Sequence, residues 1–354
     1  MNLPVNFESS LNGPTYFIAD IAANHDGDLD RALNLIRLAA EAGANAAKFQ
    51  NFQAKTIVSK LGFSNLGQIA HQKSWDQDVY TVYDNASIPL DWTEQLKKEC
   101  LRNNIDYSTS PYDLDYIKFF SDKIPYFKIG SGDITWKESI VQIASYNKPI
   151  ILATGASTIQ EVDDAVGLIQ KFNVPLVLMQ CNTNYLGDAE NFNYINLLTL
   201  RQYQHRYKNV VLGLSDHTEG FITVLGAVSL GARVIEKHFT DDNLRKGPDH
   251  AFSLEPQTWS EMVKATRLLE KALGDGFKKI EANELESRIV QRRALRYTSN
   301  LKKGDKIKKS DLIALRPCPK DGVSPFDLEK IVGSQLINDV FADQQVKLAD
   351  FKND

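Results

Sequence analysis

Short β-rich runs that end in polar residues alternate with amphipathic stretches along most of the chain. The first run, Tyr16–Ala22, leads into a polar loop and then into Leu29–Ala42, whose apolar residues recur at helical spacing until Gly43 ends the helix. The predicted strands are Tyr16–Ala22, Ala44–Gln50, Asp106–Thr109, Tyr126–Gly130, Pro149–Thr154, Pro175–Cys181, Val210–Ser215 and Ala232–His238. Such a series of strand–helix units over about 260 residues predicts a (β/α)8 barrel. An open doubly wound sheet is the alternative, but its GxGxxG sequence does not follow the first strand.

Two parts of the chain depart from this rhythm. The interval Asn51–Ile105 is too long for one unit, so we expect an inserted loop over Lys60–Asn85 and then a helix over Leu90–Asn103. After the predicted helix Trp259–Leu273 the chain becomes polar, and then forms short β-like runs broken by turns and a final helix, Pro325–Ile331. We therefore predict a barrel over 1–273, a linker over 274–292 and a small domain over 293–354.

Composition and charge narrow the class of protein. Of 354 residues, 43% are hydrophobic and 24% charged, which excludes a disordered chain. The net charge is −4, and the densest basic stretch, Leu301–Lys309, is interrupted by Asp305, so we expect no nucleic-acid partner. No stretch approaches the roughly 20 apolar residues of a membrane span, and the first residues lack the pattern of a signal peptide. Three widely spaced cysteines fit a reducing compartment, and we expect a cytoplasmic protein.

Chemically reactive residues gather where the predicted strands end, which is where barrels place their sites. Lys48 and Lys128 lie near the ends of two strands; because a buried lysine needs an anionic partner, they predict either an anionic substrate or a structural ion pair inside the barrel. His217 and His238 follow neighbouring strands at the same level. Two imidazoles suit a divalent transition metal, although satisfied core histidines are about as common.

Several motifs together resemble one family. IADIAANHDGD, AAKFQ, KIGSGD, GLSDHTEG, VIEKHFT and GPDH, in this order, resemble the sialic acid synthase family, and LKKGDKIKKSDLIALRP resembles its C-terminal antifreeze-like (SAF) domain. The resemblance implies a (β/α)8 barrel followed by a small SAF domain. It also implies an enzyme, a transferase, that joins phosphoenolpyruvate to the open-chain aldehyde of an N-acetylated hexosamine. The expected sugar is N-acetylmannosamine or a 2,4-diacetamido-trideoxyhexose, and the products are a nine-carbon sugar acid and phosphate.

The resemblance also implies roles for residues. The phosphoenolpyruvate shell would be Lys48, Thr109, Lys128, Ser131 and Ser215. The sugar shell would be Gln50, Asp133, Tyr185, Asp249 and Arg316. The residues expected to act in catalysis are Asp20, Asp133, Glu236 and Lys128, with either Asp133 or Glu236 as general base. His217 and His238 would hold a divalent ion, Mn²⁺ first and Mg²⁺ or Co²⁺ as alternatives. Arg316 would reach the active site of a second subunit, which implies a domain-swapped homodimer.

Two positions depart from the family pattern. Asp20 stands where the family usually has glutamate, and Ala153 stands where a serine commonly contacts phosphoenolpyruvate. These departures keep a non-catalytic, sugar-binding relative open as an alternative. Another metal-dependent barrel aldolase or isomerase, acting on a phosphorylated sugar, would explain the histidines and lysines but not the C-terminal domain.

Overall fold

The computed structural model describes residues 7, 11, 13–67, 69, 72–73, 75–185 and 189–352. The chain divides into two compact units, 1–274 and 275–354, each with its own apolar core. Within the described residues, no helix is both long enough and apolar enough to cross a membrane.

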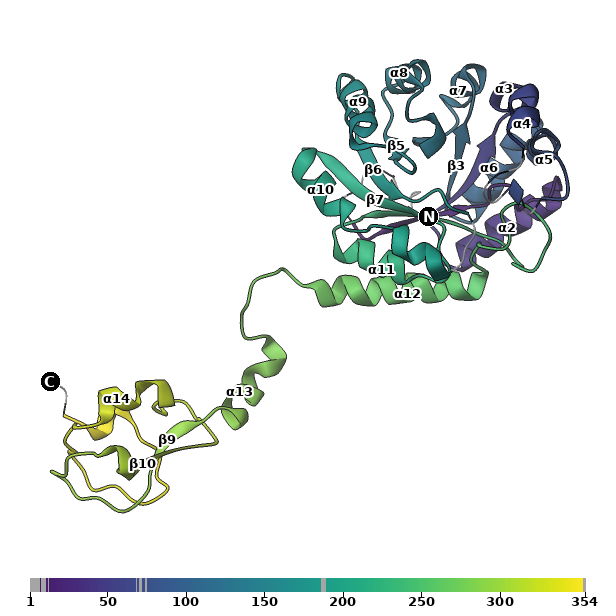
Figure 1. Ribbon diagram of the computed structural model, residues 1–354. Helices are drawn as coiled ribbons and strands as arrows, with labels where there is room; N and C mark the ends of the chain where they lie inside the picture. Colours follow the sequence, from purple (N-terminus) through teal and green to yellow (C-terminus); the bar gives the residue numbers. More distant parts are fainter. Residues whose placement is uncertain are drawn as a thin grey trace. The chain divides into compact units, whose positions relative to one another are not determined.

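The first unit is a closed barrel of parallel strands, as the alternating pattern predicts (Figure 1). The strands are β1 (Tyr16–Asp20), β2 (Ala46–Asn51), β3 (Asp106–Pro111), β4 (Phe127–Ile129), β5 (Ile150–Ala153), β6 (Leu176–Cys181), β7 (Val210–Asp216) and β8 (Val234–His238). Hydrogen-bonded neighbours run in the order β3-β2-β1-β8-β7-β6-β5-β4, and the two end strands, β3 and β4, pack against each other. The (β/α)8 barrel is therefore confirmed.

A helix follows each strand along the chain, and together these helices form the outer layer (Figure 1). They are α2 (Leu29–Glu41), α6 (Thr93–Arg102), α7 (Leu114–Phe120), α8 (Lys137–Ser145), α9 (Ile159–Gln170), α10 (Thr199–Arg206), α11 (Ile222–Ser229) and α12 (Pro256–Leu273). Local sequence sets their ends: Asp28 caps the first turn of α2 by accepting from the Arg31 amide, and Gly43 follows that helix at φ +95°. Thr158 and Glu161 form a capping box at the start of α9.

Alternation along the strands separates two apolar regions. Phe17 and Ala47 face the helices and belong to the main core, whereas Ile18 and Ala46 face the barrel interior. The interior is filled by side chains toward the amino ends of the strands, where Tyr16 forms an aromatic cluster with Phe7 and Tyr126. Only the carboxyl ends of the strands are left to form a cavity.

The insertion after β2 differs from the expected loop. It contains α3 (Ala54–Ile57), α4 (Lys60–Leu66) and α5 (Val79–Ala86), and the predicted helix Leu90–Asn103 is a 3-10 turn, η2 (Leu90–Trp92), followed by α6. Ser59 and Asp78 supply the side-chain caps that begin α4 and α5. These helices are short. α4 is mostly exposed, and the apolar residues of α5 span only two turns, so neither carries the long apolar stripe that marks a helix in the sequence.

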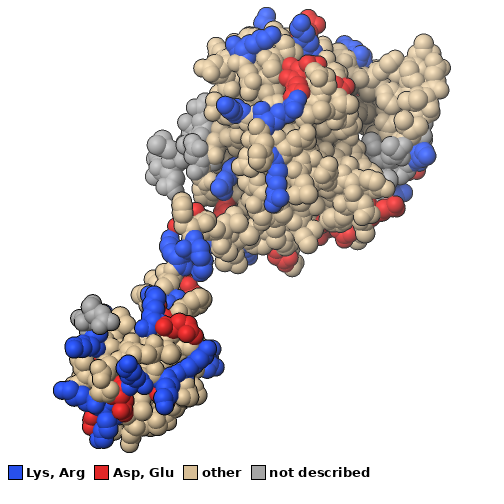
Figure 2. Space-filling model, turned by 60° about the vertical axis from the view of Figure 1, so that its left-hand side comes forward, with Lys and Arg blue, Asp and Glu red and all other residues tan. Residues whose placement is uncertain are grey.

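The second unit is small. Its elements are η5 (Ala282–Glu284), α13 (Leu285–Gln291), β9 (Ala294–Tyr297), η6 (Lys309–Asp311), β10 (Leu312–Leu315), η7 (Pro325–Asp327), α14 (Leu328–Ile331) and η8 (Leu348–Asp350). The segment predicted as a plain linker thus holds a short helix, α13. Basic and acidic side chains are both scattered over the visible face of this unit (Figure 2), and Lys302 Nζ of the basic stretch lies 2.8 Å from Asp339 Oδ2.

Candidate active site

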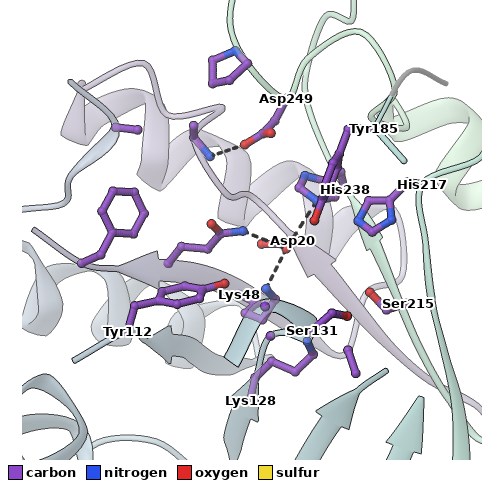
Figure 3. Close-up of a pocket in the computed structure, with 18 of the residues that line it drawn as sticks. Asp20, Lys48, Tyr112, Lys128, Ser131, Tyr185, Ser215, His217, His238 and Asp249 are labelled. Carbon is purple, nitrogen blue, oxygen red and sulfur yellow. Dashed lines mark hydrogen bonds and ion pairs between the residues drawn. The ribbon is translucent and has the colours of Figure 1, made fainter. Parts of the chain in front are cut away.

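A cavity of about 330 Å³ opens at the carboxyl ends of the barrel strands (Figure 3). It brings together most of the residues that the sequence marks as candidates. Those that line it are Asp20, Lys48, Gln50, Lys128, Ser131, Asp133, Tyr185, Ser215, His217, Glu236, His238 and Asp249. They come from strands far apart in the sequence, because parallel strands of a barrel end at one rim.

Two lysines and two carboxylates form a buried charge network on the cavity floor. Lys48 Nζ lies 2.7 Å from Asp20 Oδ2 and 3.6 Å from Glu236 Oε2, and Lys128 Nζ lies 3.3 Å from Glu236 Oε1. The Ser215 hydroxyl donates to Glu236 Oε1 at 3.0 Å. Burial alone would raise the pKa of Glu236, but the two lysines hold it at about 2. Burial raises the pKa of Asp20, and the charge of Glu236 adds to this effect. The structure therefore contains the ion pairs, and places them where a substrate anion can reach the lysines.

The two candidate metal ligands face each other across the cavity wall. The ring centroids of His217 and His238 lie 5.3 Å apart. Nδ1 of His217 lies 2.9 Å from the carbonyl oxygen of Asn182. When Nδ1 carries the proton and donates it to this oxygen, Nε2 keeps a free lone pair. Nδ1 of His238 is buried and has no hydrogen-bond partner among the described residues. Burial lowers the pKa of both imidazoles to about 3, with further effects from His238 on His217 and from Lys48 on His238, so both are neutral.

Neutral imidazoles with free lone pairs suit a divalent transition metal, so these residues fit the group that the sequence predicts. Within the described ranges, no cluster of three or more His, Cys, Asp or Glu side chains is arranged to hold an ion. The protein would thus supply two ligands, and substrate or water the rest.

Tight turns beside Lys128 shape one end of the cavity. The amide of Gly155 donates to the Ser131 hydroxyl at 2.8 Å. A Cβ at Gly155 would lie 2.9 Å from Ser131 Oγ and 3.1 Å from Cys181 Sγ, so this close approach requires glycine. Burial raises the pKa of the Cys181 thiol, which fits a packing role. Ala153 lines the same end and offers no hydroxyl.

Two further carboxylates lie nearer the mouth. Burial raises the pKa of Asp133 to about 6, although Lys128 opposes the shift, and burial also raises that of Asp249 to about 6. The amide of Ala23 donates to Asp249 Oδ2 at 3.1 Å. Tyr185 packs its ring against His217 with a centroid separation of 4.4 Å. This end of the cavity therefore combines aromatic surface with two groups that titrate close to neutral pH.

Two candidates do not line the cavity. Thr109 is the register partner of Phe49 and so faces the helices; its hydroxyl donates to Asn51 Oδ1 at 2.6 Å, while its neighbour Ser108 pairs with Lys48 on the inner face. In that orientation the Thr109 side chain points away from the cavity, which does not support a direct contact with substrate. Arg316 lies just after β10 in the second unit, where it is exposed and has no ion pair within the described ranges. Its role in a partner subunit stays a prediction.

Several lining residues were not found from the sequence. The insertion supplies an apolar wall, and Tyr112 directly follows β3; its hydroxyl oxygen would lie 3.0 Å from a Cβ at Gly130. The wall residues are Phe52, Ile57, Trp75, Val82, Tyr83 and Ala86. Tyr112 was detectable because it directly follows a strand. Val82, Tyr83 and Ala86 recur at helical spacing, but the sequence alone does not show that they face the cavity.

Comparison with known proteins agrees with this geometry. The model of the NeuB family matches residues 35–278, and that of the SAF domain matches 292–352. The chain belongs to the NeuB family. Its C-terminal residues form a SAF domain, as the sequence motif predicts.

Several relatives of this NeuB-family chain are named as synthases of sialic-type acids. The N,N'-diacetyllegionaminic acid synthase of Campylobacter jejuni is 33% identical over 94% of this chain and 99% of that protein. The human N-acetylneuraminate-9-phosphate synthase is 27% identical over 94% and 91%, respectively. The solved N-acetylneuraminic acid synthetase of Leptospira borgpetersenii, in complex with citrate, aligns with a TM-score of 0.68 and 28% identity, covering 78% of this chain and 90% of that one. The chain is thus similar to nonulosonic acid synthases along nearly its whole length.

Proposed function

We propose that this protein condenses phosphoenolpyruvate with the open-chain aldehyde of an N-acylated sugar to give a nonulosonic acid and phosphate. The observation that carries the proposal is one cavity with two lysines at one end and two facing neutral histidines beside aromatic surface. The lysines suit a small polyanion, and the histidines suit an ion that binds a sugar oxygen. The named relatives, which are synthases of legionaminic and sialic acids, support the same chemistry.

The reaction forms one carbon–carbon bond and breaks one carbon–oxygen bond. C3 of phosphoenolpyruvate attacks the aldehyde carbon, and the aldehyde oxygen takes a proton and becomes a hydroxyl group. Water adds at C2 and loses a proton. The C2–O bond to phosphate then breaks, and its electron pair leaves with the phosphate. The new hydroxyl group at C2 gives up its remaining proton, so that C2 becomes a keto group and hydrogen phosphate is released.

Residues on the cavity floor would hold phosphoenolpyruvate. Lys48, Lys128, Ser131 and Ser215 supply donors for its carboxylate and phosphate, and the lysines stabilise the charge that builds up when water adds. Both lysines are already paired with carboxylates. When the substrate binds, its anionic groups would take the place of these carboxylates as partners of the lysines. This arrangement keeps both lysines oriented before binding.

We assign the general base to Asp133. Glu236 forms ion pairs with two lysines and accepts a hydrogen bond from the Ser215 hydroxyl, and its pKa of about 2 makes it a weak proton acceptor near neutral pH. Asp133 lines the cavity beside Lys128 and has a pKa of about 6, which suits proton transfer near neutral pH. His217 and His238 would hold Mn²⁺, with Mg²⁺ or Co²⁺ as alternatives, and the ion would supply Lewis-acid polarisation of the aldehyde.

The sugar end of the cavity favours an unphosphorylated, acylated deoxy sugar. Its cavity-facing carboxylates, Asp133 and Asp249, would repel a sugar phosphate, and the only cations among the described lining residues are Lys48 and Lys128 on the floor. The insertion adds an apolar wall that suits methyl and acetyl groups better than hydroxyl groups. We therefore place a 2,4-diacetamido-2,4,6-trideoxyhexose ahead of N-acetylmannosamine. In this proposal a second copy of the chain completes the site with its own Arg316, as a domain-swapped homodimer.

A substrate panel tests the proposal. The full-length protein is incubated with Mn²⁺, phosphoenolpyruvate and, in turn, the trideoxy sugar, N-acetylmannosamine and N-acetylmannosamine 6-phosphate, and released phosphate is measured. We expect release with the first two, faster with the trideoxy sugar, and none above background with the third. Turnover of a sugar without phosphoenolpyruvate would instead indicate an aldolase or isomerase. Retained Mn²⁺ binding with no phosphate release from any sugar would indicate a non-catalytic relative.

A further inference from the structure

A fully buried ion pair lies outside the cavity, on the outer face of the barrel sheet. Lys237 Nζ lies 2.6 Å from Asp216 Oδ2, and the two side chains are 0% and 1% exposed. Both residues are register partners at the ends of β7 and β8. Neither lines the cavity, so substrate binding and catalysis as described above make no direct use of them.

The pair has a complete set of hydrogen-bond partners. Asp216 accepts from the Thr218 amide at 3.2 Å and from the hydroxyl groups of Thr218 and Thr223 at 3.0 and 2.8 Å. Lys237 also donates to the carbonyl oxygen of Thr218. Burial alone would raise the pKa of Asp216, but Lys237 lowers it, so the carboxylate stays charged. Thr223 lies in the first turn of α11, so the network joins both strand ends to the helix that covers them.

Packing alone does not call for such a pair. Buried ion pairs are often no more stabilising than apolar side chains of similar volume, because removing two charges from water offsets their attraction. The neighbouring outward residues, Leu214 and Ile235, are apolar and belong to the main core. On the outer face of these strands, a charged pair thus takes the place of apolar residues at the strand ends. There the pair orients the strand ends more than it adds to apolar packing.

The position of the pair relative to the cavity follows from the alternation of side chains along the two strands. Asp216 lies between Ser215 and His217, and Lys237 lies between Glu236 and His238, whose side chains all enter the cavity. An ion pair between the intervening residues holds the two strand ends in one register. We propose that Asp216 and Lys237 are positioning residues that fix the separation of the two metal-binding histidines. This inference rests on the metal site of the proposed function.

Manganese affinity tests the inference directly, without turnover. Free Mn²⁺ is titrated into the full-length protein and followed by electron paramagnetic resonance, for the parent and for Asp216→Asn/Lys237→Met, which replaces the ions with neutral side chains of similar volume. We expect the dissociation constant to rise severalfold, because the two histidines would no longer be held at a fixed separation. The matched control, Tyr16→Phe/Asp106→Asn, removes a hydrogen bond at the opposite end of the barrel. It should lower thermal stability, but its Mn²⁺ affinity should equal that of the parent.

The outcomes separate this inference from the proposal beneath it. A parent that does not bind Mn²⁺ overturns the metal site and this inference with it. A parent that binds Mn²⁺ and a folded double variant that binds equally well overturn the positioning role alone. If the double variant does not fold, Thr223→Val decides: it keeps both ions and removes one hydrogen bond to Asp216, and an unchanged dissociation constant would count against the role.

Discussion

Replacing Asp133 with asparagine removes the proposed general base and keeps the size of the side chain. Asp133 lines the cavity, and burial raises its pKa from 3.8 to about 6, with Lys128 as the cation that opposes the shift. Tyr83 and Tyr112 also interact with it, and burial raises the pKa of both, so they stay neutral across the range of the assay. Asp133 and Asp249 are therefore the two groups at this end of the cavity whose charge changes near pH 6.

The size of the effect follows from this pKa. A base must be deprotonated to act, and a carboxylate with a pKa of about 6 is roughly nine-tenths ionised at pH 7 and one-tenth at pH 5. Rates that depend on Asp133 should thus fall about tenfold between pH 7 and pH 5. Asp133→Asn should lower kcat at pH 7 by about 10²- to 10⁴-fold, the usual range for a general base, and the remaining activity should lose that acidic limb.

The assay is phosphate release at saturating substrates between pH 5 and pH 8. The phosphate group of phosphoenolpyruvate titrates near the same pH, so the comparison between variants decides, not the shape of one curve. Asp249→Asn is the matched control, because Asp249 also has a pKa of about 6 and lines the same cavity, but is assigned to sugar binding. It should raise KM for the sugar and keep the acidic limb. If Asp133→Asn keeps the limb and Asp249→Asn loses it, our assignment of the base is wrong.

Three further predictions concern metal, sugar and phosphoenolpyruvate. His217→Ala or His238→Ala should abolish measurable Mn²⁺ binding in a paramagnetic resonance titration and remove turnover, because the part of the chain that the structure describes offers no cluster of three or more ligands that could replace the lost one; unchanged binding would contradict the site. Arg316→Ala should raise KM for the N-acylated sugar but not KM for phosphoenolpyruvate. If the variant has the same KM for the sugar as the parent, Arg316 of a second copy does not contact the sugar. Ala153→Ser should lower KM for phosphoenolpyruvate about 2- to 10-fold, the worth of one hydrogen bond of roughly 0.5–1.5 kcal/mol, with KM for the sugar as the internal control.

Much of the fold could be predicted because its signals are local. Most of the eight strands contain a short run of apolar residues, because the helices cover one face and the barrel interior the other, although β3 is largely polar. Most of the helices between them carry a periodic apolar stripe. The insertion was mistaken for a loop because its helices are short: α4 has no buried residue, and the apolar stripe of α5 spans only two turns. Of the residues of the cavity wall, Tyr83 belongs to that stripe, whereas Trp75 lies outside any helix and is brought to the cavity only by the tertiary structure.

The site shows the same division. Lys48, Lys128, His217 and His238 could be named in advance, because charged and imidazole side chains stand out in strands and because barrels place their sites where the strands end. Thr109 does not line the cavity, because a shift of one residue along a strand moves a side chain to the opposite face, and motif order does not reveal which face a residue occupies.

By itself, the sequence determined the barrel, the attached SAF domain and the residue types that can hold an anion and a metal, because each depends on neighbours close along the chain. Only the tertiary structure decided how those residues act together. It placed Glu236 between two lysines, left Asp133 as a carboxylate with a pKa near 6, and set a buried Asp216–Lys237 pair behind the histidines. Charges, burial and register are properties of groups brought together from distant strands, and they exist only once the barrel has closed.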